Sequence, residues 1–480
     1  MSDLSNFFVK KVILNRVNVN NDTVSFQYLL DGGPLNLKLH YNSVNFDHPK
    51  LNANEEAVKT FAVTLGVAGF LRFGAVLPEY FDIKKYHSWV HPALLKFLKE
   101  VFPHWSEHRY QVGRLDYRAT KILPSDKLGE SVQLPIWQQN GQFHPKVMVA
   151  SGSGKDSLLC ATLIEKANVD YDFVTYIHNL YGETTEQYYI FDRLSQHLNF
   201  QNHHLITIDD DYYLWLETRL KEYQVREYLQ EQGITKPFRT EAGEVLCNPL
   251  MFAPIQIVHD LELAIVGHEK SADAPNFIIP ETGEKIAHQW AKSIEGENAV
   301  HRLLNNLFKN IGCVSITKPI YDVSIFKLLF QITGELPYLT NSCNIKKPWC
   351  CECEKCAYVF AGFTAFGNHK RTIEAFGDDL FQREKLLQTW RELLGLEGYI
   401  PWECVGQAEE VQLYFYKAYH AGVTGTAINL FCEEILSKIN GDPEVYFNNI
   451  EHKYSQVDCE HHLPIWLLEK VMPILHGKRS

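Results

Sequence analysis

The stretch VMVASGSGKDSLLCATLIEKA, residues 147 to 167, decides the fold of this chain. Its apolar beginning predicts a buried strand over residues 146–150, and residues 157–167 have the apolar spacing of a helix. Glycines, a lysine and serines lie between the two elements. A loop at the carboxyl end of a strand that opens a helix directs backbone N–H groups and the helix dipole at an anion. The stretch therefore predicts an anion-binding loop.

The loop is not a Walker A loop. That pattern requires G-x-x-x-x-G-K-[ST], in which the hydroxyl after the lysine binds magnesium. Here Asp156 follows Lys155, and Val149 occupies the position of the first glycine. Glycines allow close approach, serines offer hydroxyls and the lysine adds charge, so the candidate nucleotide ligands are Ser151, Gly152, Ser153, Gly154, Lys155, Asp156 and Ser157. The alternative is a Ser/Gly-rich strand-to-helix turn that binds nothing.

Strand and helix patterns alternate after this loop. Strands are expected over residues 172–180, 203–209 and 261–271, with helices over 184–198 (Thr184 as its cap) and 254–261. Such alternation predicts an α/β fold with a parallel sheet that helices cover on both faces.

The two ends of the chain have other patterns. Residues 7–45 read as three short strands, 54–75 as a buried helix capped by Asn54, and 91–105 as a further helix. A polar stretch over 124–142 resembles a linker, and the chain beyond 366 is helical in character. We therefore expect a strand-rich and helical N-terminal domain (1–135), a nucleotide-binding domain (136–366) and a helical C-terminal region (367–480).

A second set of polar residues follows the strand expected at 261–271. Gly267 permits close approach, and His268, Glu269 and Lys270 are delivered to the same sheet edge as the loop. The segment HQWAKS adds His288 with Gln289, Lys292 and Ser293. Ordinary polar surface loops are the alternative for both segments.

Composition limits the class of protein. The chain has 480 residues, 45% hydrophobic and 22% charged, and a formal net charge of -12. The acidic balance disfavours nucleic acid and anionic membranes as partners and leaves room for a local basic site. We find no signal peptide and no run of about 18 apolar residues. A cytoplasmic enzyme with a small-molecule substrate is the expectation.

Five of the eleven cysteines fall between residues 343 and 356. Cys343, Cys350, Cys353 and Cys356 have spacing that suits a tetrahedral zinc site, whereas Cys351 falls between ligand positions. Four sulfur ligands leave no open coordination position, so a structural role is favoured. An iron–sulfur cluster, free buried cysteines and a thiol carrier are the alternatives.

The string Gly152-Ser153-Gly154-Lys155-Asp156-Ser157 resembles the S-G-G-x-D-S loop of the ATP pyrophosphatase (PP-loop) families. In those families the loop holds the β- and γ-phosphates as pyrophosphate while a substrate oxygen attacks the α-phosphorus. The resemblance implies a sheet of the adenine nucleotide alpha hydrolase-like type. Ser153 departs from the pattern, because the families usually have glycine there.

The order of motifs narrows the resemblance. FAVTLGVAGFLRFGAVLPEYFDI, the GKDS loop, GHEKSAD, HQWAKS and NSC–WCCECEKCAYVF resemble the UDP-N-acetylmuramoyl-L-alanyl-L-glutamate epimerases of the MurL type over roughly residues 5 to 370. The resemblance implies an ATP- and Mg²⁺-dependent inversion of the terminal L-Glu of a UDP-sugar peptide, through an acyl-adenylate. Lys155 and the loop would hold pyrophosphate and Asp156 would help place magnesium, while His268, Glu269 and His288 are the candidates for proton transfer.

Three other functions share some of these motifs. A 7-cyano-7-deazaguanine synthase-like adenylating enzyme, acting on a deazaguanine, nucleotide or protein substrate, combines the same loop with a four-cysteine zinc site, but 7-cyano-7-deazaguanine synthases are roughly half as long. A tRNA-thiolating enzyme would need a basic RNA-binding surface. A degenerate loop protein that only senses nucleotide is the non-enzymatic alternative.

Overall fold

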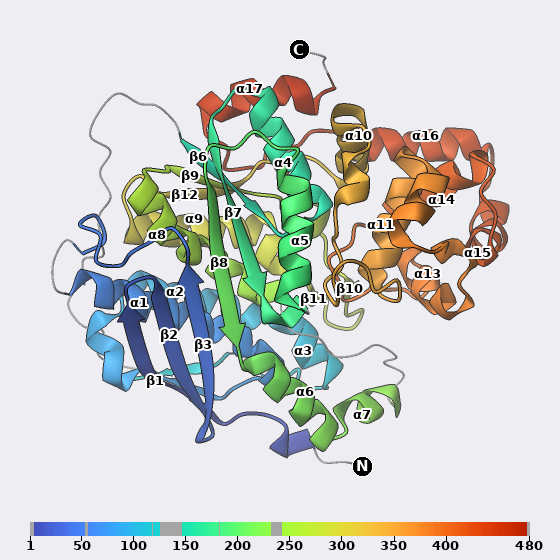
Figure 1. Cartoon of the computed structure of the whole chain (residues 1–480). Coiled ribbons are helices and arrows are strands. Elements are labelled where there is room, and N and C mark those ends of the chain that lie inside the picture. The colour runs from blue at the N-terminus through green and yellow to red at the C-terminus, as the bar shows by residue number, and fades with distance from the viewer. Residues whose placement is uncertain are drawn as a thin grey trace.

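The structure, a computed structural model, describes residues 4–52, 56–117, 119–124, 146–181, 183–231 and 242–477. Its largest element is a sheet of ten strands in the order β12-β9-β6-β7-β8-β3-β2-β1-β4-β5 (Figure 1). The five strands from β12 to β8 are parallel, the middle of the sheet from β8 to β1 is antiparallel, and β1, β4 and β5 pair in parallel at the other end. The fold class is α/β, as the alternating pattern predicts.

The parallel end of the sheet contains β6 (Val147–Ser151), β7 (Tyr171–His178), β8 (His203–Asp210), β9 (Leu263–Val266) and β12 (Gly312–Ser315). Neighbouring members of this set pair in parallel. The strands predicted on either side of the loop therefore form, and β12 is a strand that the sequence reading did not identify.

Helices cover both faces of the parallel strands. Along β6, Val147 and Val149 belong to one hydrophobic core and Met148 to the other, because successive side chains point to opposite faces. The helices on the first face include α4 (Lys155–Lys166), α5 (Thr184–Ser195) and α10 (Asp322–Thr333); α8 (Asn248–His259) and α9 (Ile294–Leu307) cover the second (Figure 1). Thr184 is the first residue of α5 rather than its cap, a position that Glu183 occupies.

The three predicted N-terminal strands are β1 (Lys11–Asn20), β2 (Thr23–Leu30) and β3 (Gly33–Tyr41). They pair antiparallel with one another, and β3 pairs antiparallel with β8 through Leu37 and Asp210, so they extend the central sheet. The short strands β4 (Tyr80–Asp82) and β5 (Lys121–Leu123) complete that edge. Most of the predicted linker and the boundary at 135/136 lie outside the described residues, and the division into domains stays a prediction.

The segment after these strands is a core helix. The helix predicted over 54–75 consists of α1 (Ala57–Ala68) followed by a 3-10 helix (Gly69–Val76), and Asn54 lies outside the described residues. Residues 57–76 have the length and mean hydropathy, 1.3, of a membrane span, which was not predicted from the sequence, but 89% of the most apolar part of this segment is buried inside the protein.

The remaining α-helices and strands that precede α9 are α2 (Pro92–Val101), α3 (Ser106–Gln111), α6 (Tyr212–Glu222), α7 (Val225–Glu231), β10 (Phe277–Ile278) and β11 (Lys285–Ile286).

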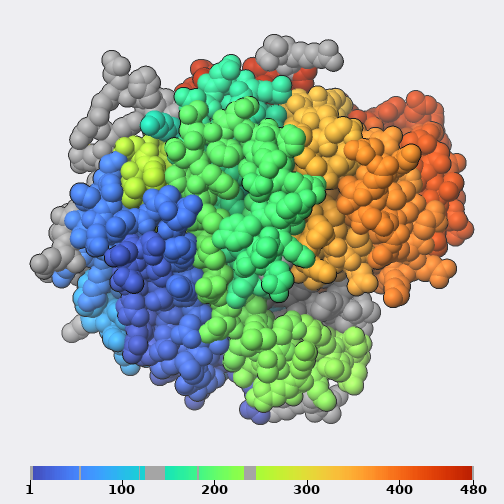
Figure 2. Space-filling view, viewed as in Figure 1, coloured from blue at the N-terminus to red at the C-terminus, as the bar shows by residue number. Residues whose placement is uncertain are grey.

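The C-terminal part of the chain is helical, as expected. Its helices are α11 (Glu354–Phe366), α12 (His369–Phe376), α13 (Leu387–Leu393), α14 (Ala408–His420), α15 (Thr426–Glu434), α16 (Pro443–Tyr454) and α17 (Ile465–Leu475). They share one hydrophobic core with α4 and α10, in which Trp390 is fully buried. In Figure 2 the helices α11–α16 and the N-terminal strands lie at opposite sides of the visible face, with residues 147–210 between them.

Candidate active site

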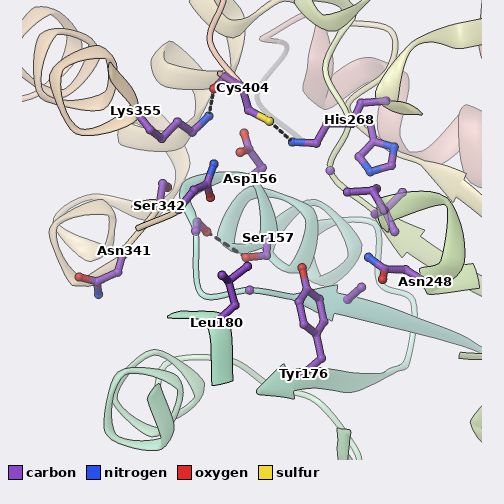
Figure 3. Close-up of a pocket in the computed structure, with 18 of the residues that line it drawn as sticks. Asp156, Ser157, Tyr176, Leu180, Asn248, His268, Asn341, Ser342, Lys355 and Cys404 are labelled. Atoms are coloured by element: carbon purple, nitrogen blue, oxygen red, sulfur yellow. Dashed lines mark hydrogen bonds between the residues drawn. The ribbon is translucent and has the colours of Figure 1, made fainter. Parts of the chain in front are cut away.

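An open pocket of about 270 Å³ lies at the carboxyl ends of β6, β7 and β9 (Figure 3). From β6 the chain proceeds to β7 and β8 on one side, and then returns to β9 and β12 on the other. Such a reversal is the point at which open α/β sheets bind ligands. The pocket therefore occupies the position that the fold offers for a ligand.

The loop 151–157 forms one wall of this pocket through Gly152, Gly154, Asp156 and Ser157. The Ser157 hydroxyl donates to the Gly154 carbonyl oxygen at 2.9 Å, and the Ser153 N–H donates to Ser151 Oγ at 3.1 Å. These bonds hold the glycine-rich backbone against the pocket at the N-terminus of α4, where a helix attracts an anion.

Ser153 has a left-handed backbone conformation, with φ of 55°. The side chain is fully buried, and its hydroxyl has no hydrogen-bond partner among the described residues. A side chain in this conformation is strained and glycine is not. The departure from the PP-loop pattern therefore falls on a position whose geometry favours glycine.

Lys155 is not among the residues that line the pocket. Its ammonium is fully buried and pairs with Asp156 at 2.5 Å and with Asp322 at 2.6 Å. Burial alone would lower the pKa of Lys155, but these two carboxylates raise it, so the side chain is a fixed cation. In this structure Lys155 ties α4 to α10.

Three other lysines, Lys292, Lys347 and Lys355, line the pocket, against two carboxylates from Asp156 and Glu403. The Lys347 ammonium donates to the Asn341 carbonyl at 2.5 Å and the Gly152 carbonyl at 3.4 Å, and burial lowers its pKa to about 8. A chain with a net charge of -12 thus presents a locally cationic pocket. Sequence reasoning missed Lys347 and Lys355, because no local pattern connects them to the loop.

The residues after β9 divide between the pocket and the interior. Gly267 and His268 line the pocket, and burial lowers the pKa of His268 to about 3, so its imidazole is neutral. Gly267 is required for close packing, because a Cβ there would lie 2.9 Å from the Cβ of Asp156.

Glu269 and Lys270 are not among the residues that line the pocket. Burial would raise the pKa of Glu269, but lysines led by Lys292 lower it to about 2, so this carboxylate is an anion behind the pocket wall. The Lys270 ammonium pairs with Asp273, Asp458 and Glu460 at 3.1, 2.9 and 3.3 Å.

His288 lines the pocket as a buried cation. Its Nδ1 lies 2.5 Å from Oε2 of Glu107, a residue of α3. Burial would lower the pKa of His288, but Glu107 raises it well above the ordinary value. The pair joins the second pocket segment to the N-terminal half of the chain.

Cys404 is the pocket residue that sequence reasoning missed most clearly. Its sulfur accepts a hydrogen bond from the Lys292 ammonium at 2.9 Å, and its carbonyl accepts one from Lys355 (Figure 3). Burial raises the pKa of a thiol, but Lys292 and His288 outweigh burial and lower that of Cys404. The local sequence carries no sign of this, since the partners lie far apart in the chain.

The four-cysteine cluster is next to the pocket in the chain, because Ser342 and Lys355, the neighbours of Cys343 and Cys356, line the pocket. The sulfur atoms of Cys343 and Cys353 are 3.9 Å apart, and those of Cys350 and Cys356 are 3.7 Å apart. A tetrahedral zinc ion with Zn–S bonds of about 2.3 Å places its sulfur ligands about 3.8 Å from one another. The four thiols therefore fit zinc, and they would anchor the segment that carries Asn341 and Ser342 into the pocket.

Cys351 is separate from this group of sulfur atoms. Its thiol donates to the Phe376 carbonyl at 3.4 Å. A backbone φ of 57° directs this residue away from its neighbours in the sequence.

Fold and site together define an α/β protein with a cationic ligand pocket at the switch point of its sheet and a four-cysteine cluster beside that pocket. Residues 338–425 match the family model of the MurL C-terminal domain. Similar proteins named UDP-N-acetyl-alpha-D-muramoyl-L-alanyl-L-glutamate epimerase occur in Micromonospora sp. and in Salinispora tropica. The comparisons thus show that part of this chain is similar to the MurL epimerases, with the family-model match lying in residues 338–425.

The likeness to these relatives covers part of each chain. The Micromonospora and Salinispora proteins are each 31% identical over 174 residues, which is 34% of this chain and 38% and 37% of the relatives. The relative of the same name from Xanthomonas oryzae is 26% identical over 173 residues, with 34% and 38% covered. The matched part thus spans less than two fifths of the length of these curated relatives.

The matched C-terminal domain contributes directly to the pocket. Seven of the lining residues fall inside the match, namely Asn341, Ser342, Asn344, Lys347, Lys355, Glu403 and Cys404. The segment that matches the MurL C-terminal domain model and the loop 151–157 therefore meet at the pocket, where the Lys155 N–H donates to Ser342 Oγ at 3.2 Å.

Proposed function

We propose that this protein is an ATP-dependent epimerase of the cytoplasm that acts in peptidoglycan precursor synthesis. It adenylates the terminal L-Glu carboxylate of UDP-MurNAc-L-Ala-L-Glu, inverts the α-carbon to D-Glu, and releases AMP and pyrophosphate. The observation that supports the proposal is the composition of the pocket: a glycine-rich strand-to-helix loop that resembles a PP-loop lines the same cavity as residues of the segment that matches the MurL C-terminal domain model.

The loop is suited to the phosphates of ATP. The backbone of Gly152 and Gly154 lines the pocket at the start of α4, and the helix dipole favours negative charge there. Lys347 supports the loop through the Gly152 carbonyl and adds a positive charge beside it. Asp156 offers a carboxylate oxygen on the same wall, the kind of ligand that Mg²⁺ takes together with substrate phosphates.

Adenylation prepares the α-carbon for inversion. Deprotonation next to a carboxylate would place a second negative charge beside the first, whereas an adenylated carboxyl group is neutral at that position and accepts the electron pair. Proton transfer then requires titratable groups within reach of the substrate. His268 and His288 line the pocket within reach of the substrate, but His288 is held as a cation by Glu107 and cannot take a proton. Glu269 acts through the charge that it offers to Lys292.

The direct experiment supplies the protein with ATP, Mg²⁺ and UDP-MurNAc-L-Ala-L-Glu. The expected result is AMP together with D-Glu in the hydrolysed product. UDP-MurNAc-L-Ala, which lacks the glutamate, is the substrate control and should give no AMP. AMP formed only with a deazaguanine carboxylic acid or with RNA would replace the proposal, and a protein that forms neither AMP nor D-Glu would refute it.

Matched variants connect this reaction to the pocket. Lys347→Met removes a lining cation beside the loop, and it should lower AMP formation at least tenfold through loss of electrostatic stabilisation. Lys166→Met removes an exposed lysine at the other end of α4, and it should leave the rate unchanged. Equal effects of the two substitutions would contradict the assignment of this pocket.

A further inference from the structure

Three pocket residues from two distant segments form one charged cluster. Cys404 comes from the segment between α13 and α14, whereas His288 and Lys292 come from the segment that precedes α9. The Lys292 ammonium lies 2.9 Å from the Cys404 sulfur, and His288 interacts with the same sulfur. All three side chains line the cavity beside the loop.

We propose that the Cys404 thiolate is the group that removes the α-proton of the adenylated glutamyl substrate, with Lys292 and His288 as its positioning residues. This inference rests on the epimerase function proposed above. It assigns a catalytic role to a residue that no motif in the sequence marks.

The charges that face Cys404 favour the thiolate. Lys292 and His288 both present positive charge to the sulfur. The nearest carboxylate, Glu403, accepts a hydrogen bond from the Cys404 N–H at 2.7 Å, and Lys355 donates to the Cys404 carbonyl. The residue is therefore held at both backbone atoms while its sulfur faces two cations.

The surroundings of the sulfur suit a base better than a metal ligand. One ligand atom each from His288, Glu403 and Cys404 lie within 4.8 Å of one another, a spacing that an ion can share. However, an ammonium already contacts the sulfur, and the His288 ring is held by Glu107 as a cation. A divalent ion would meet two positive charges, whereas a proton acceptor is stabilised by both.

The proposed step balances without any further reactant. The α C–H bond breaks, its proton forms the S–H bond of Cys404, and the electron pair moves into the adenylated acyl group as an enolate. A proton from solvent then forms the new C–H bond on the opposite face. The thiol releases its proton to solvent and becomes a thiolate again, so the α-hydrogen of the product comes from water.

The test compares Cys404→Ser and Cys404→Ala with the unmodified protein in D₂O. We expect the formation of D-Glu and the exchange of the α-hydrogen for deuterium to fall at least 100-fold, because a positioned base contributes about 10²–10⁴-fold. ATP-dependent release of AMP should change less than tenfold, which shows that the variants fold and adenylate. Cys459→Ser, at an exposed cysteine outside the pocket, is the matched control and should keep all three rates.

A second readout addresses the protonation of the thiol. Alkylation of Cys404 by iodoacetamide, followed at that peptide by mass spectrometry, should proceed at neutral pH and be blocked by ATP with substrate. In Lys292→Met the pH midpoint of alkylation should move upward, since the ammonium no longer stabilises the thiolate. Lys292 thereby gains a signature as a positioning residue that a loss of packing would not produce.

The outcomes separate the two proposals. If the unmodified protein forms neither AMP nor D-Glu, the proposed function fails and this inference fails with it. If the unmodified protein makes D-Glu and the Cys404 variants do so at the same rate, only the inference is refuted. A metal ion beyond that of the four-cysteine site, lost in Cys404→Ser, would also overturn it.

Discussion

Replacement of Ser153 by glycine should stabilise the protein. Ser153 has φ of 55°, and its buried hydroxyl has no hydrogen-bond partner among the described residues. The left-handed conformation costs a residue with a Cβ about 1 kcal/mol, and an unsatisfied buried hydroxyl costs about 1–2 kcal/mol. Glycine removes both costs, but it loses about 0.4–1 kcal/mol through the greater freedom of the unfolded chain.

The net expectation for Ser153→Gly is a gain of about 1–2 kcal/mol in the free energy of unfolding. Ser153→Ala separates the two contributions, because alanine removes the hydroxyl and keeps the strained Cβ. Its expected gain is about 1 kcal/mol, which places the order of stability at glycine, alanine, serine.

Equilibrium urea unfolding, followed by tryptophan fluorescence, measures the three proteins under the same conditions. The free energy follows from the midpoint and the slope of each transition. Ser153→Gly less stable than the unmodified protein would refute the reasoning altogether. An alanine variant more stable than the glycine variant by about 0.4–1 kcal/mol would show that the backbone conformation carries no strain, because only the freedom of the unfolded chain would then separate them.

Other parts of the site give three further predictions. Cys343→Ser should abolish a stoichiometric zinc content and lower the melting temperature, whereas Cys351→Ser should retain the metal. Elemental analysis measures the zinc and calorimetry the melting temperature of both variants, and a metal-free, fully stable parent protein would contradict this prediction. Gly267→Ala should lower the free energy of unfolding by about 1–3 kcal/mol and reduce AMP formation, because the new Cβ would lie 2.9 Å from the Cβ of Asp156 in the first turn of α4. An unchanged rate of AMP formation would show that the loop tolerates the displacement of α4. Burial would raise the pKa of Glu107, but the His288 cation outweighs burial and lowers it. The Glu107 carboxylate therefore stabilises the fold above its unfolded pKa of about 4.3, and this stabilisation is lost as the pH falls below that value. The Glu107→Gln variant should not show this loss of stability in an acid titration.

The sequence predicts those parts of the fold that local patterns specify. The strand and helix around residues 147–167 form as expected, since periodicity and glycines act over a few residues. The four cysteines come together because their spacing is short. The N-terminal strands were also predicted, but strand patterns do not say which edge they join, and β3 joins β8 of the same sheet.

The site itself depends on contacts between distant segments. Lys155 carries the charge expected at a phosphate loop, yet Asp322, which lies far along the chain, draws its ammonium inward. The cations that line the pocket instead include Lys292 and Lys355, and both contact Cys404. No window of sequence contains these pairs, so only the packing of the C-terminal domain against the sheet brings them together.

The pairing of β3 with β8 has a consequence for the order of synthesis. Leu37 leaves the ribosome long before Asp210, its partner across the two strands. At about 5–20 residues per second, the N-terminal hairpins wait roughly ten seconds or longer for the strand that covers their open edge. During that interval the nascent chain exposes an unpaired strand edge, the kind of surface that chaperones bind and that drives aggregation.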